Sequence, residues 1–536
     1  MSLVEVTDLT VEFGSLRAVD ALSFRLERGA ALALVGESGS GKSTVASALL
    51  GLHRGTGARV TGSVLVAGID VQAASDEELR RLRGAKAAMV FQDPLSALDP
   101  YYAIGDQIAE VHRVHTRVSR RAARARAVEV LDRVGIPDAA RRSRSRPHEF
   151  SGGMRQRALI AMALACEPDL LIADEPTTAL DVTVQAQILD LLHGLREETG
   201  TGLLLVTHDV GVAAESVDEV LVMRHGRTVE HGGVGTVLTA PASAYTRELL
   251  AAVPRVDAPR ADSRATDEVV LEATGLRREF GRGKRAFAAV DDVSLTVRRG
   301  ETLGVVGESG SGKTTLGRML VGLLEPTAGT IRYDGRPHTG VDPSVQMVFQ
   351  DPVSSLNPRR SVGESIADPL RARGAAPGEH GRDEERIGRR VRELLERVGL
   401  DGAHYDRYPH EFSGGQRQRV GIARALAADP RVIVCDEPVS ALDVTTQAQV
   451  VALLGELQKE LGLALVFVAH DLAVVRQVSD RVAVMRKGRI VEEGPADTVY
   501  DSPQDPYTKE LLAAVPALDP GVAALRRAAR RELSAA

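Results

Sequence analysis

Short apolar runs recur along the chain, and a glycine-rich or polar segment follows each of them at once. Such short runs are typical of strands that are buried on both faces of a sheet. Helix-patterned segments separate them, so the pattern predicts an α/β sheet with helices on both sides. The runs are Ala31–Val35, Leu170–Ala173 and Leu203–Thr207 in the first half, and Leu303–Val306, Val432–Cys435 and Leu465–Ala469 in the second.

Two further helix-patterned stretches, rich in Arg and Glu, lie at 111–134 and 382–398 and predict a small α-helical subdomain in each half. The longest apolar stretches, Leu203–Val206 and Leu463–Ala469, fall well short of the roughly 18 residues that a membrane span needs. The first residues, MSLVEVTDLT, have neither a basic nor an apolar region of a secretion signal. We therefore expect a cytosolic protein.

The two halves of the 536-residue chain repeat one another. Phe91-Gln92-Asp93-Pro94 returns 258 residues later, and FSGGMRQR at 150–157 returns 262 residues later as FSGGQRQR at 412–419. Glycine-rich loops at 36–43 and 307–314 are 271 residues apart, which places a 13-residue deletion and then a four-residue insertion in the second half. The offset of 262 also relates Asp174-Glu175-Pro176 to Asp436-Glu437-Pro438, His208-Asp209 to His470-Asp471, and Tyr245-Thr246 to Tyr507-Thr508.

Such a repeat predicts two domains, since the chain is too long for a single core. The first domain is expected at 1–253 and the second at 270–516, with a C-terminal extension at 517–536. Residues 254–269 (PRVDAPRADSRATDEV) have no periodicity and are interpreted as a linker.

Both glycine-rich loops match G-x-x-x-x-G-K-[ST] between a strand-like run and a helix-like one. Their backbone N–H groups can surround phosphate oxygens at a helix N-terminus, the lysine adds a positive charge, and the final hydroxyl binds Mg²⁺. Two matches in equal contexts predict nucleotide binding. The loops are Gly36-Glu37-Ser38-Gly39-Ser40-Gly41-Lys42-Ser43, followed by Thr44, and Gly307-Glu308-Ser309-Gly310-Ser311-Gly312-Lys313-Thr314, followed by Thr315.

The order of phosphate loop, glutamine loop, SGG signature, Asp-Glu pair, D-loop and histidine resembles the nucleotide-binding domains of ATP-binding cassette proteins. The resemblance covers nearly the whole chain, twice. It implies two tandem P-loop ATPase domains, each with a RecA-like α/β core, an antiparallel β subdomain and an α-helical subdomain. It also implies ATP and Mg²⁺ as cofactors. The D-loops are Thr178-Ala179-Leu180-Asp181 and Ser440-Ala441-Leu442-Asp443.

The resemblance assigns roles to the residues that follow the buried runs. Asp174 and Asp436 would hold Mg²⁺ through water, and Glu175 and Glu437 would polarise the attacking water. His208 and His470 would contact the γ-phosphate, and Gln92 and Gln350 would touch Mg²⁺ and the water. A helix cap is the structural alternative for the acids, as is a plain structural role for each histidine.

In this family the signature of one domain completes the ATP site of the other. Ser151, Gly153 and Met154 would close on nucleotide held by Lys313, and Ser413, Gly415 and Gln416 on nucleotide held by Lys42. Met154 departs from the usual glutamine, for which we expect a modest effect. Phe13 and Phe280 stand where the family stacks an aromatic ring on adenine; a core phenylalanine is the alternative, and Phe287 is a weaker candidate.

Further segments resemble the ATPases of dipeptide, oligopeptide and nickel importers: QDPLSALDP at 92–100, QDPVSSLNP at 350–358, PHEF before each signature, and the tails PASAYTRELLAAVP and PQDPYTKELLAAVP. A packed terminal helix is the alternative for such a tail. The resemblance implies two membrane-spanning permease subunits and an extracytoplasmic solute-binding protein as partners, at the cytoplasmic face of the membrane. Many relatives carry a cysteine cluster after the tail, but Cys166 and Cys435 are the sole cysteines, so we expect no iron–sulfur cluster.

The main alternative to an importer ATPase is a soluble twin-cassette ATPase that acts on ribosomes or nucleic acid. A net charge of −6 gives no support to nucleic-acid binding, and a soluble twin-cassette ATPase of ribosomes or nucleic acid would usually carry a long charged linker, metal-binding cysteines or coiled coils. An exporter ATPase is a third possibility that the tails disfavour. The transported solute stays open among dipeptides, longer peptides, glutathione-like compounds and nickel chelates.

Overall fold

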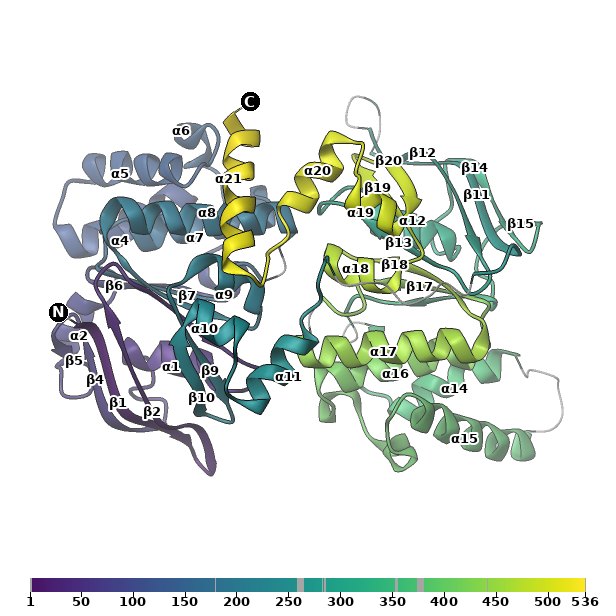
Figure 1. Ribbon diagram of the computed structural model, residues 1–536, viewed down its shortest axis with the longest axis horizontal. Coiled ribbons are helices and arrows are strands. Elements are labelled where there is room, and N and C mark those ends of the chain that lie inside the picture. Colours follow the sequence, from purple (N-terminus) through teal and green to yellow (C-terminus); the bar gives the residue numbers. More distant parts are fainter. Residues whose placement is uncertain are drawn as a thin grey trace. The chain divides into compact units, whose positions relative to one another are not determined.

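The computed structural model describes residues 2–178, 180–257, 265–281, 283, 286–351, 355–373, 380–440 and 442–535 (Figure 1). The chain divides into two compact units. Met1–Val253 and Pro516–Ala536 form the first, and Pro254–Val515 form the second. Ala179, Ala441 and 352–354, parts of the predicted D-loops and second glutamine loop, lie outside the described residues.

The first unit is built on a six-stranded sheet in the order β10-β9-β3-β8-β7-β6. Its neighbouring strands are parallel except for the antiparallel pair of β9 and β10. The three strands expected from apolar runs are β3, β7 and β8, which lie next to one another within this sheet. The strands are β3 (Ala31–Val35), β6 (Ala87–Val90), β7 (Leu170–Asp174), β8 (Gly202–Thr207), β9 (Glu219–Arg224) and β10 (Arg227–Gly233).

Alternate residues of these strands belong to two different cores. Leu32 and Leu34 of β3 pack in a cluster with helix α1 (Lys42–Leu49) and the antiparallel sheet. Ala33 and Val35 belong to a second cluster, with buried residues from helices between Ile104 and Leu249. Because side chains alternate along a strand, this division buries both faces of the sheet, and the predicted α/β class is confirmed.

The antiparallel sheet covers the α1 side of the unit, in the order β2-β1-β4-β5. Its two long strands alternate between buried and exposed positions, as expected for a sheet with one solvated face. The strands are β1 (Ser2–Phe13), β2 (Leu16–Glu27), β4 (Arg59–Val66) and β5 (Ile69–Asp70).

The helical stretch expected at 111–134 is two helices. Helix α4 (Ile104–Thr116) ends where Arg117 takes a left-handed conformation, with φ 55°. Helix α5 (Arg120–Arg133) begins after Ser119, whose hydroxyl accepts a hydrogen bond from the Ala122 N–H. The other helices of the unit are α2 (Asp76–Leu82), α3 (Pro94–Ala97), α6 (Ala139–Arg142), α7 (Gly152–Leu164), α8 (Val182–Thr199), α9 (Val210–Ser216), α10 (Val234–Thr239), α11 (Ala244–Ala252), α21 (Pro520–Ala535) and the 3₁₀ turn η1 (Pro147–Glu149).

The second unit repeats this architecture, with sheets β12-β11-β14-β15 and β16-β17-β18-β13-β19-β20. Its strands are β11 (Val269–Phe280), β12 (Phe287–Arg298), β13 (Thr302–Val306), β14 (Ala328–Tyr333), β15 (Arg336–His338), β16 (Val345–Val348), β17 (Val432–Asp436), β18 (Ala464–Val468), β19 (Arg481–Arg486) and β20 (Arg489–Pro495). Its helices are α12 (Lys313–Leu320), α14 (Val362–Arg373), α15 (His380–Arg397), α16 (Gly414–Ala427), α17 (Val444–Leu461), α18 (Leu472–Val478), α19 (Ala496–Asp501), α20 (Pro506–Ala513) and the 3₁₀ turns η3 (Gly402–Asp406) and η4 (Pro409–Glu411).

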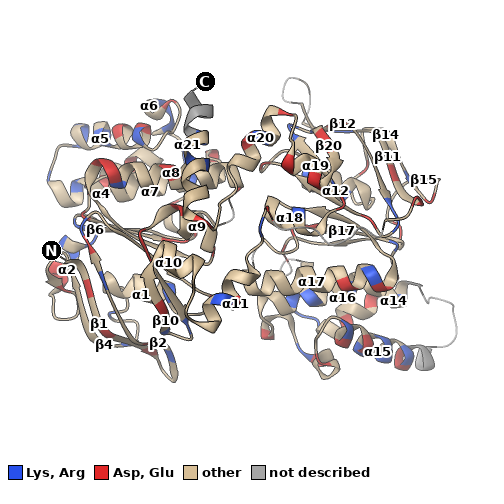
Figure 2. Ribbon diagram, in the orientation of Figure 1, with Lys and Arg blue, Asp and Glu red and all other residues tan. Residues whose placement is uncertain are grey.

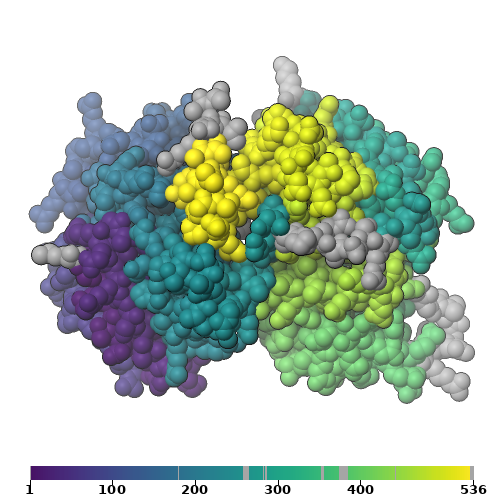
Figure 3. Space-filling model, viewed as in Figure 1, coloured from purple at the N-terminus to yellow at the C-terminus, as the bar shows by residue number. Residues whose placement is uncertain are grey.

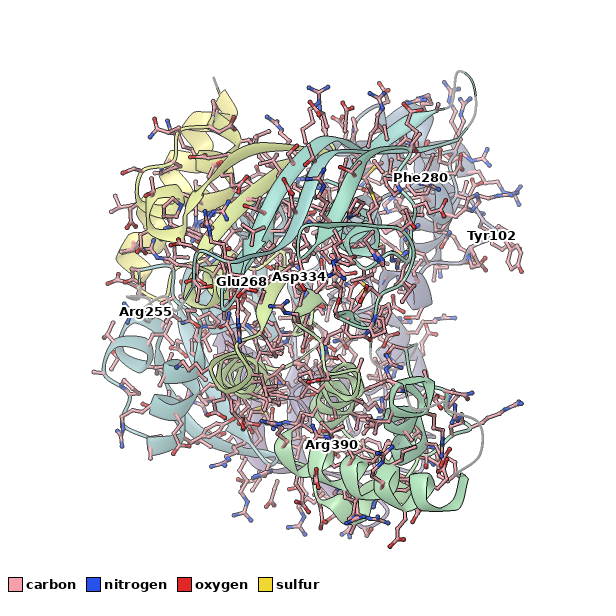
Figure 4. All side chains as sticks on the ribbon, turned by 90° about the vertical axis from the view of Figure 1, so that its right-hand side faces the viewer. Tyr102, Arg255, Glu268, Phe280, Asp334 and Arg390 are labelled. Atoms are coloured by element: carbon pink, nitrogen blue, oxygen red, sulfur yellow. The ribbon has the colours of Figure 1, made fainter. Side chains whose placement is uncertain are left out.

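The predicted deletion corresponds to the loss of one helix. In the first unit α2 lies between β5 and β6, whereas the described chain runs from β15 to β16 without a helix. Arg431, just before β17, pairs with Glu268 and Asp334, two acids that lie near each other beside the antiparallel sheet (Figure 4). This cation joins the antiparallel sheet of the second unit to its central one.

Candidate active sites

The first phosphate loop connects β3 to the N-terminus of α1. The Lys42 ammonium is buried and donates to the backbone oxygens of Gly36 and Glu37, at 2.7 and 2.8 Å. Its third contact is the Ser40 hydroxyl at 3.3 Å. The lysine is thereby fixed across the loop that surrounds it.

Glycine is required at the end of this loop. Gly41 has φ 99°, and a Cβ there would lie 2.3 Å from the Ala18 carbonyl oxygen. Gly312 of the second loop has φ 108° and faces the Ala289 oxygen in the same way, at 2.2 Å. Neither position has room for a side chain, so the backbone of the antiparallel sheet fixes the conformation of each loop.

Five side chains from four segments of the chain meet at the end of β7. Ser43 donates to Asp174 at 2.9 Å. Gln92 donates to Glu175 at 2.6 Å, and the Nδ1 atom of His208 lies 3.1 Å from the same carboxylate. The glutamine, the second acid and the histidine, which were predicted from three separate motifs, are therefore in one hydrogen-bonded cluster.

The acids and the histidine of this cluster have pKa values that differ from their ordinary ones. Burial raises the pKa of Asp174 to about 6, against the effect of the Ser43 hydrogen bond. Burial also acts to raise the pKa of Glu175, but the hydrogen bonds and charges of its neighbours, His208 foremost, together outweigh burial and lower that pKa. Burial acts to lower the pKa of His208, and its contact with Glu175 raises it above 6.5 overall. The pair thus favours a charged carboxylate beside a protonated imidazole.

The second unit forms the same cluster. Lys313 donates to the Gly307 and Glu308 oxygens, at 2.6 and 2.8 Å, and Thr314 donates to Asp436 at 3.0 Å. Gln350 donates to Glu437 at 2.7 Å, and the Nδ1 atom of His470 lies 3.3 Å from that glutamate. Burial raises the pKa of Asp436, whereas contact with His470 lowers the pKa of Glu437 against the effect of burial.

The two signature sequences lie at the N-termini of α7 and α16. The Ser151 and Ser413 hydroxyls each accept a hydrogen bond from the backbone three residues on, at 3.3 Å. In the second unit the Gln416 side chain also accepts from the Ser413 N–H, at 2.9 Å. Met154 has no such acceptor, so the reciprocal capping pair exists in α16 and is absent from α7.

The glycine two positions after each signature serine, Gly153 or Gly415, packs against the helix that follows the D-loop. A Cβ on Gly153 would lie 2.5 Å from the Val184 side chain, and one on Gly415 would lie 2.2 Å from Thr446. The signature helix and the helix after the D-loop are therefore in close contact within each unit.

The two phenylalanines expected to stack on adenine occupy equivalent positions in the two units. Phe13 ends β1 and pairs with Leu16, and Phe280 ends β11 and pairs with Phe287 (Figure 4). Phe13 is 39% exposed, with the His53 ring edge-on at 5.5 Å. The Phe280 and Phe287 rings are 6.0 Å apart. Neither Phe13 nor Phe280 is a fully buried core residue.

A contact that sequence reasoning missed joins the C-terminal tail to the second phosphate loop. The Tyr507 hydroxyl accepts a hydrogen bond from the Glu308 N–H at 3.0 Å, and Tyr507 is 1% exposed. Arg486 lies over the Tyr507 ring, as Arg224 lies over Tyr245, each at 4.5 Å. The Tyr-Thr repeat was visible in the sequence, but its place beside the phosphate loop was not.

Comparison with known proteins agrees with this geometry. The family model described as "ABC transporter" matches residues 19–178 and 290–440. The model described as "Oligopeptide/dipeptide transporter, C-terminal region" matches 229–279 and 491–535.

Curated relatives match along almost their whole length. The glutathione import ATP-binding protein GsiA of Salmonella choleraesuis (strain SC-B67) is 46% identical over 94% of this chain and 87% of its own. The protein of the same name from Pectobacterium atrosepticum is 45% identical over 97% of this chain and 90% of its own. None of the described helices combines the length and apolar character that a membrane span requires. The chain belongs to the ATP-binding cassette transporter ATPases, as a tandem pair of cassettes that each carry the C-terminal region of the oligopeptide and dipeptide importers.

Proposed function

We propose that this chain hydrolyses ATP at two sites and thereby drives the import of a short peptide or glutathione-like solute through separate permeases. The observation that carries the proposal is the complete cluster of Gln, Glu and His beside a lysine-bearing phosphate loop in both units. Because neither cluster lacks a member, we infer that both sites turn over.

The residues of each cluster would have different roles in hydrolysis. Glu175 and Glu437, charged and held between an amide and an imidazole, would accept a hydrogen bond from the attacking water and polarise it. His208 and His470 would then be donors toward the γ-phosphate, since their pKa values are raised. Lys42 and Lys313 would neutralise charge on the β- and γ-phosphates.

The oxygen atoms needed for Mg²⁺ are present. Ser43, in the first turn of α1, is hydrogen-bonded to Asp174, at the end of β7, and Thr314 is hydrogen-bonded to Asp436 in the same way. Each pair offers oxygen atoms as metal ligands. Mg²⁺ prefers such oxygen ligands and usually keeps several waters. These two pairs would hold Mg²⁺, which would supply positive charge against the negative charge that develops during phosphoryl transfer.

We further propose that each signature serves the site of the other unit. Ser151, Gly153 and Met154 would close on nucleotide at Lys313, and Ser413, Gly415 and Gln416 on nucleotide at Lys42. The support is that both signature serines begin a helix, where backbone N–H groups and the dipole favour a phosphate. Phe13 and Phe280, at the ends of equivalent strands, would contact the adenine ring.

Import systems of this type use membrane permeases and a solute-binding protein, and we propose that the chain docks on two permease subunits at the cytoplasmic face. Around Gln92 the side chains of Phe91, Leu95, Tyr101 and Tyr102 are 44% to 79% exposed, and Tyr102 projects from the surface in Figure 4. Exposed apolar groups so close together mark an interaction surface. The residues 258 positions after the two tyrosines are Arg359 and Arg360, so the two docking surfaces differ and would suit two different permease subunits.

The experiment that tests the hydrolytic sites uses Glu175→Gln and Glu437→Gln, singly and together. Each single change should leave ATP binding intact and lower turnover by orders of magnitude at its own site, and the double change should abolish it. The matched control is Glu248→Gln, which alters an exposed glutamate of α11 outside both clusters and should leave turnover unchanged. If a single variant hydrolyses ATP like the unmodified protein, that site is not catalytic.

Transport itself is tested in cells. A deletion strain should lose uptake of a glutathione-like or short-peptide solute, and Lys42→Ala with Lys313→Ala should fail to restore it. Unchanged uptake of all such solutes, together with a defect in translation, would instead favour the twin-cassette ATPases of ribosomes.

A further inference from the structure

The C-terminal helix α21 lies outside both ATP clusters, yet it is part of the first unit although the second unit precedes it in the chain. Space-filling atoms of its described residues lie against those of the first unit (Figure 3). Pro516 begins the contact: a Cβ placed on Gly211 of α9 would lie 3.0 Å from its ring. Leu518 packs against the apolar core of the first unit, and Ala523 is 1% exposed.

Helix α21 carries Lys or Arg positions, drawn in blue in Figure 2. Two of its arginines contact polar groups on α8 and α9. The Arg530 guanidinium contacts Asp190 at 3.1 Å and Glu215 at 3.4 Å. Arg527 contacts His193 Nε2 at 3.0 Å and donates to the backbone oxygen of Glu215. The Glu215 side chain is 1% exposed beneath them. Burial raises the pKa of Glu215, and the charges of Arg530 and Arg527 act against this rise and favour the ionised carboxylate.

The second unit lacks this arrangement. At the offset of 262, Asp190 corresponds to Ala452, His193 to Gly455 and Glu215 to Gln477. Gly455 and Gln477 line a cavity of about 290 Å³ in the second unit. The acidic groups that bind the arginines are therefore specific to the first unit, although the helices that carry them are repeated.

We propose that α8 and α9 of the first unit form an acidic docking site whose ligand is the basic C-terminal helix of the same chain. The connection from the end of the second unit to α21 is only Pro516–Asp519. A tether this short gives the helix a high effective concentration at any site that it can reach, which favours the chain's own α21 over that of a second copy.

The docked helix would connect the second unit to the catalytic loops of the first. Helix α8 begins at Asp181 of the D-loop, and α9 begins at Asp209, directly after His208. Anything that holds α8 and α9 together therefore restrains both loops.

Hydrogen–deuterium exchange of the full-length protein tests the docking. Amides of 521–530 should exchange slowly, and Asp190→Asn with Glu215→Gln, which keep shape and remove charge, should speed their exchange at least about tenfold. Arg527→Gln with Arg530→Gln should act alike, and both changes lie on α21 and leave the side chains of α8 and α9 unaltered. Arg121→Gln, an exposed arginine on α5, is the matched control and should change nothing.

Three results would overturn the proposal. The first is fast exchange of 521–530 in the unmodified protein, and the second is slow exchange that persists in both double variants. The third is loss of protection when the protein is diluted roughly a hundredfold, because an intramolecular contact is independent of concentration. In that case the occupant would be α21 of a second copy.

Discussion

The two glutamates that we propose polarise the attacking water occupy an unusual backbone conformation. Glu175 has φ 48° and Glu437 has φ 45°, a left-handed region that side chains other than glycine rarely adopt. Each follows a buried aspartate at the end of a strand, where continued alternation would direct the next side chain away. The turn instead directs both acids of a pair toward the same site, and the hydrogen bonds from Gln92 and Gln350 help to hold it.

The two cysteines differ in how deeply they are buried. Cys435 on β17 is buried, whereas Cys166 is half-buried near the Val111 backbone oxygen. Burial raises the pKa of Cys435 to about 12 and also raises that of Cys166, partly opposed by the charge of Arg126.

We predict that native Cys435 does not react with a water-soluble disulfide reagent and that Cys166 reacts slowly. Below its raised pKa the thiolate fraction of Cys166 grows about tenfold per pH unit, so labelling should accelerate by that factor from pH 7 to pH 8. Stopped labelling followed by peptide mass analysis measures both. Cys166→Ser should remove the native reaction, and rapid labelling of Cys435 without denaturant would contradict the prediction.

At the scale of elements, the two halves differ in two respects. Helix α2 of the first unit has no counterpart in the described chain between β15 and β16, and the N-termini of α7 and α16 are capped differently. The sequence offsets located the lost helix, because spacing between motifs is a local property. The break between α4 and α5 was not predicted, since the left-handed Arg117 and the capping Ser119 lie inside a continuous helical pattern.

The capping difference between α7 and α16 gives a prediction. Gln416→Met makes the second signature resemble the first and removes the hydrogen bond from the Ser413 N–H. We expect a loss of about 0.5–1 kcal/mol in the free energy of unfolding, the usual size of one capping interaction. Urea unfolding measures it. Gln416→Glu keeps an acceptor and should cost less, so an equal loss in both variants would show that the cap is not responsible.

At the scale of the whole molecule, local motifs predicted the class of fold and most residues of each cluster. They could not supply the contacts between distant segments. Gln92 and Glu175 are 83 residues apart, Glu308 and Tyr507 are 199 apart, and Asp190 and Arg530 are 340 apart. Such pairs depend on how strands and helices are ordered in space, which spacing along one sequence does not encode.

We predict that closure around ATP occurs within one chain. Residues 254–269 can extend over roughly 50 Å, and each signature is proposed to need the phosphate loop of the other unit. The double variant Glu175→Gln, Glu437→Gln should therefore become more compact with ATP and Mg²⁺ while light scattering still gives the mass of a single chain. Adding Lys42→Ala and Lys313→Ala should prevent compaction, and a shift to the mass of two chains would contradict the prediction.

The assignment of the last residues to the first unit has a consequence for biosynthesis. A ribosome must add the 262 residues of 254–515 after it has finished Val253 and before Pro516 appears. At about 5–20 residues per second, this takes roughly 13 to 52 seconds. During that interval the nascent first cassette exists without α21, and the buried Glu215 has no arginine above it. Premature release of the polypeptide would leave that carboxylate uncovered, so the first cassette reaches its final form only when translation of the second is complete.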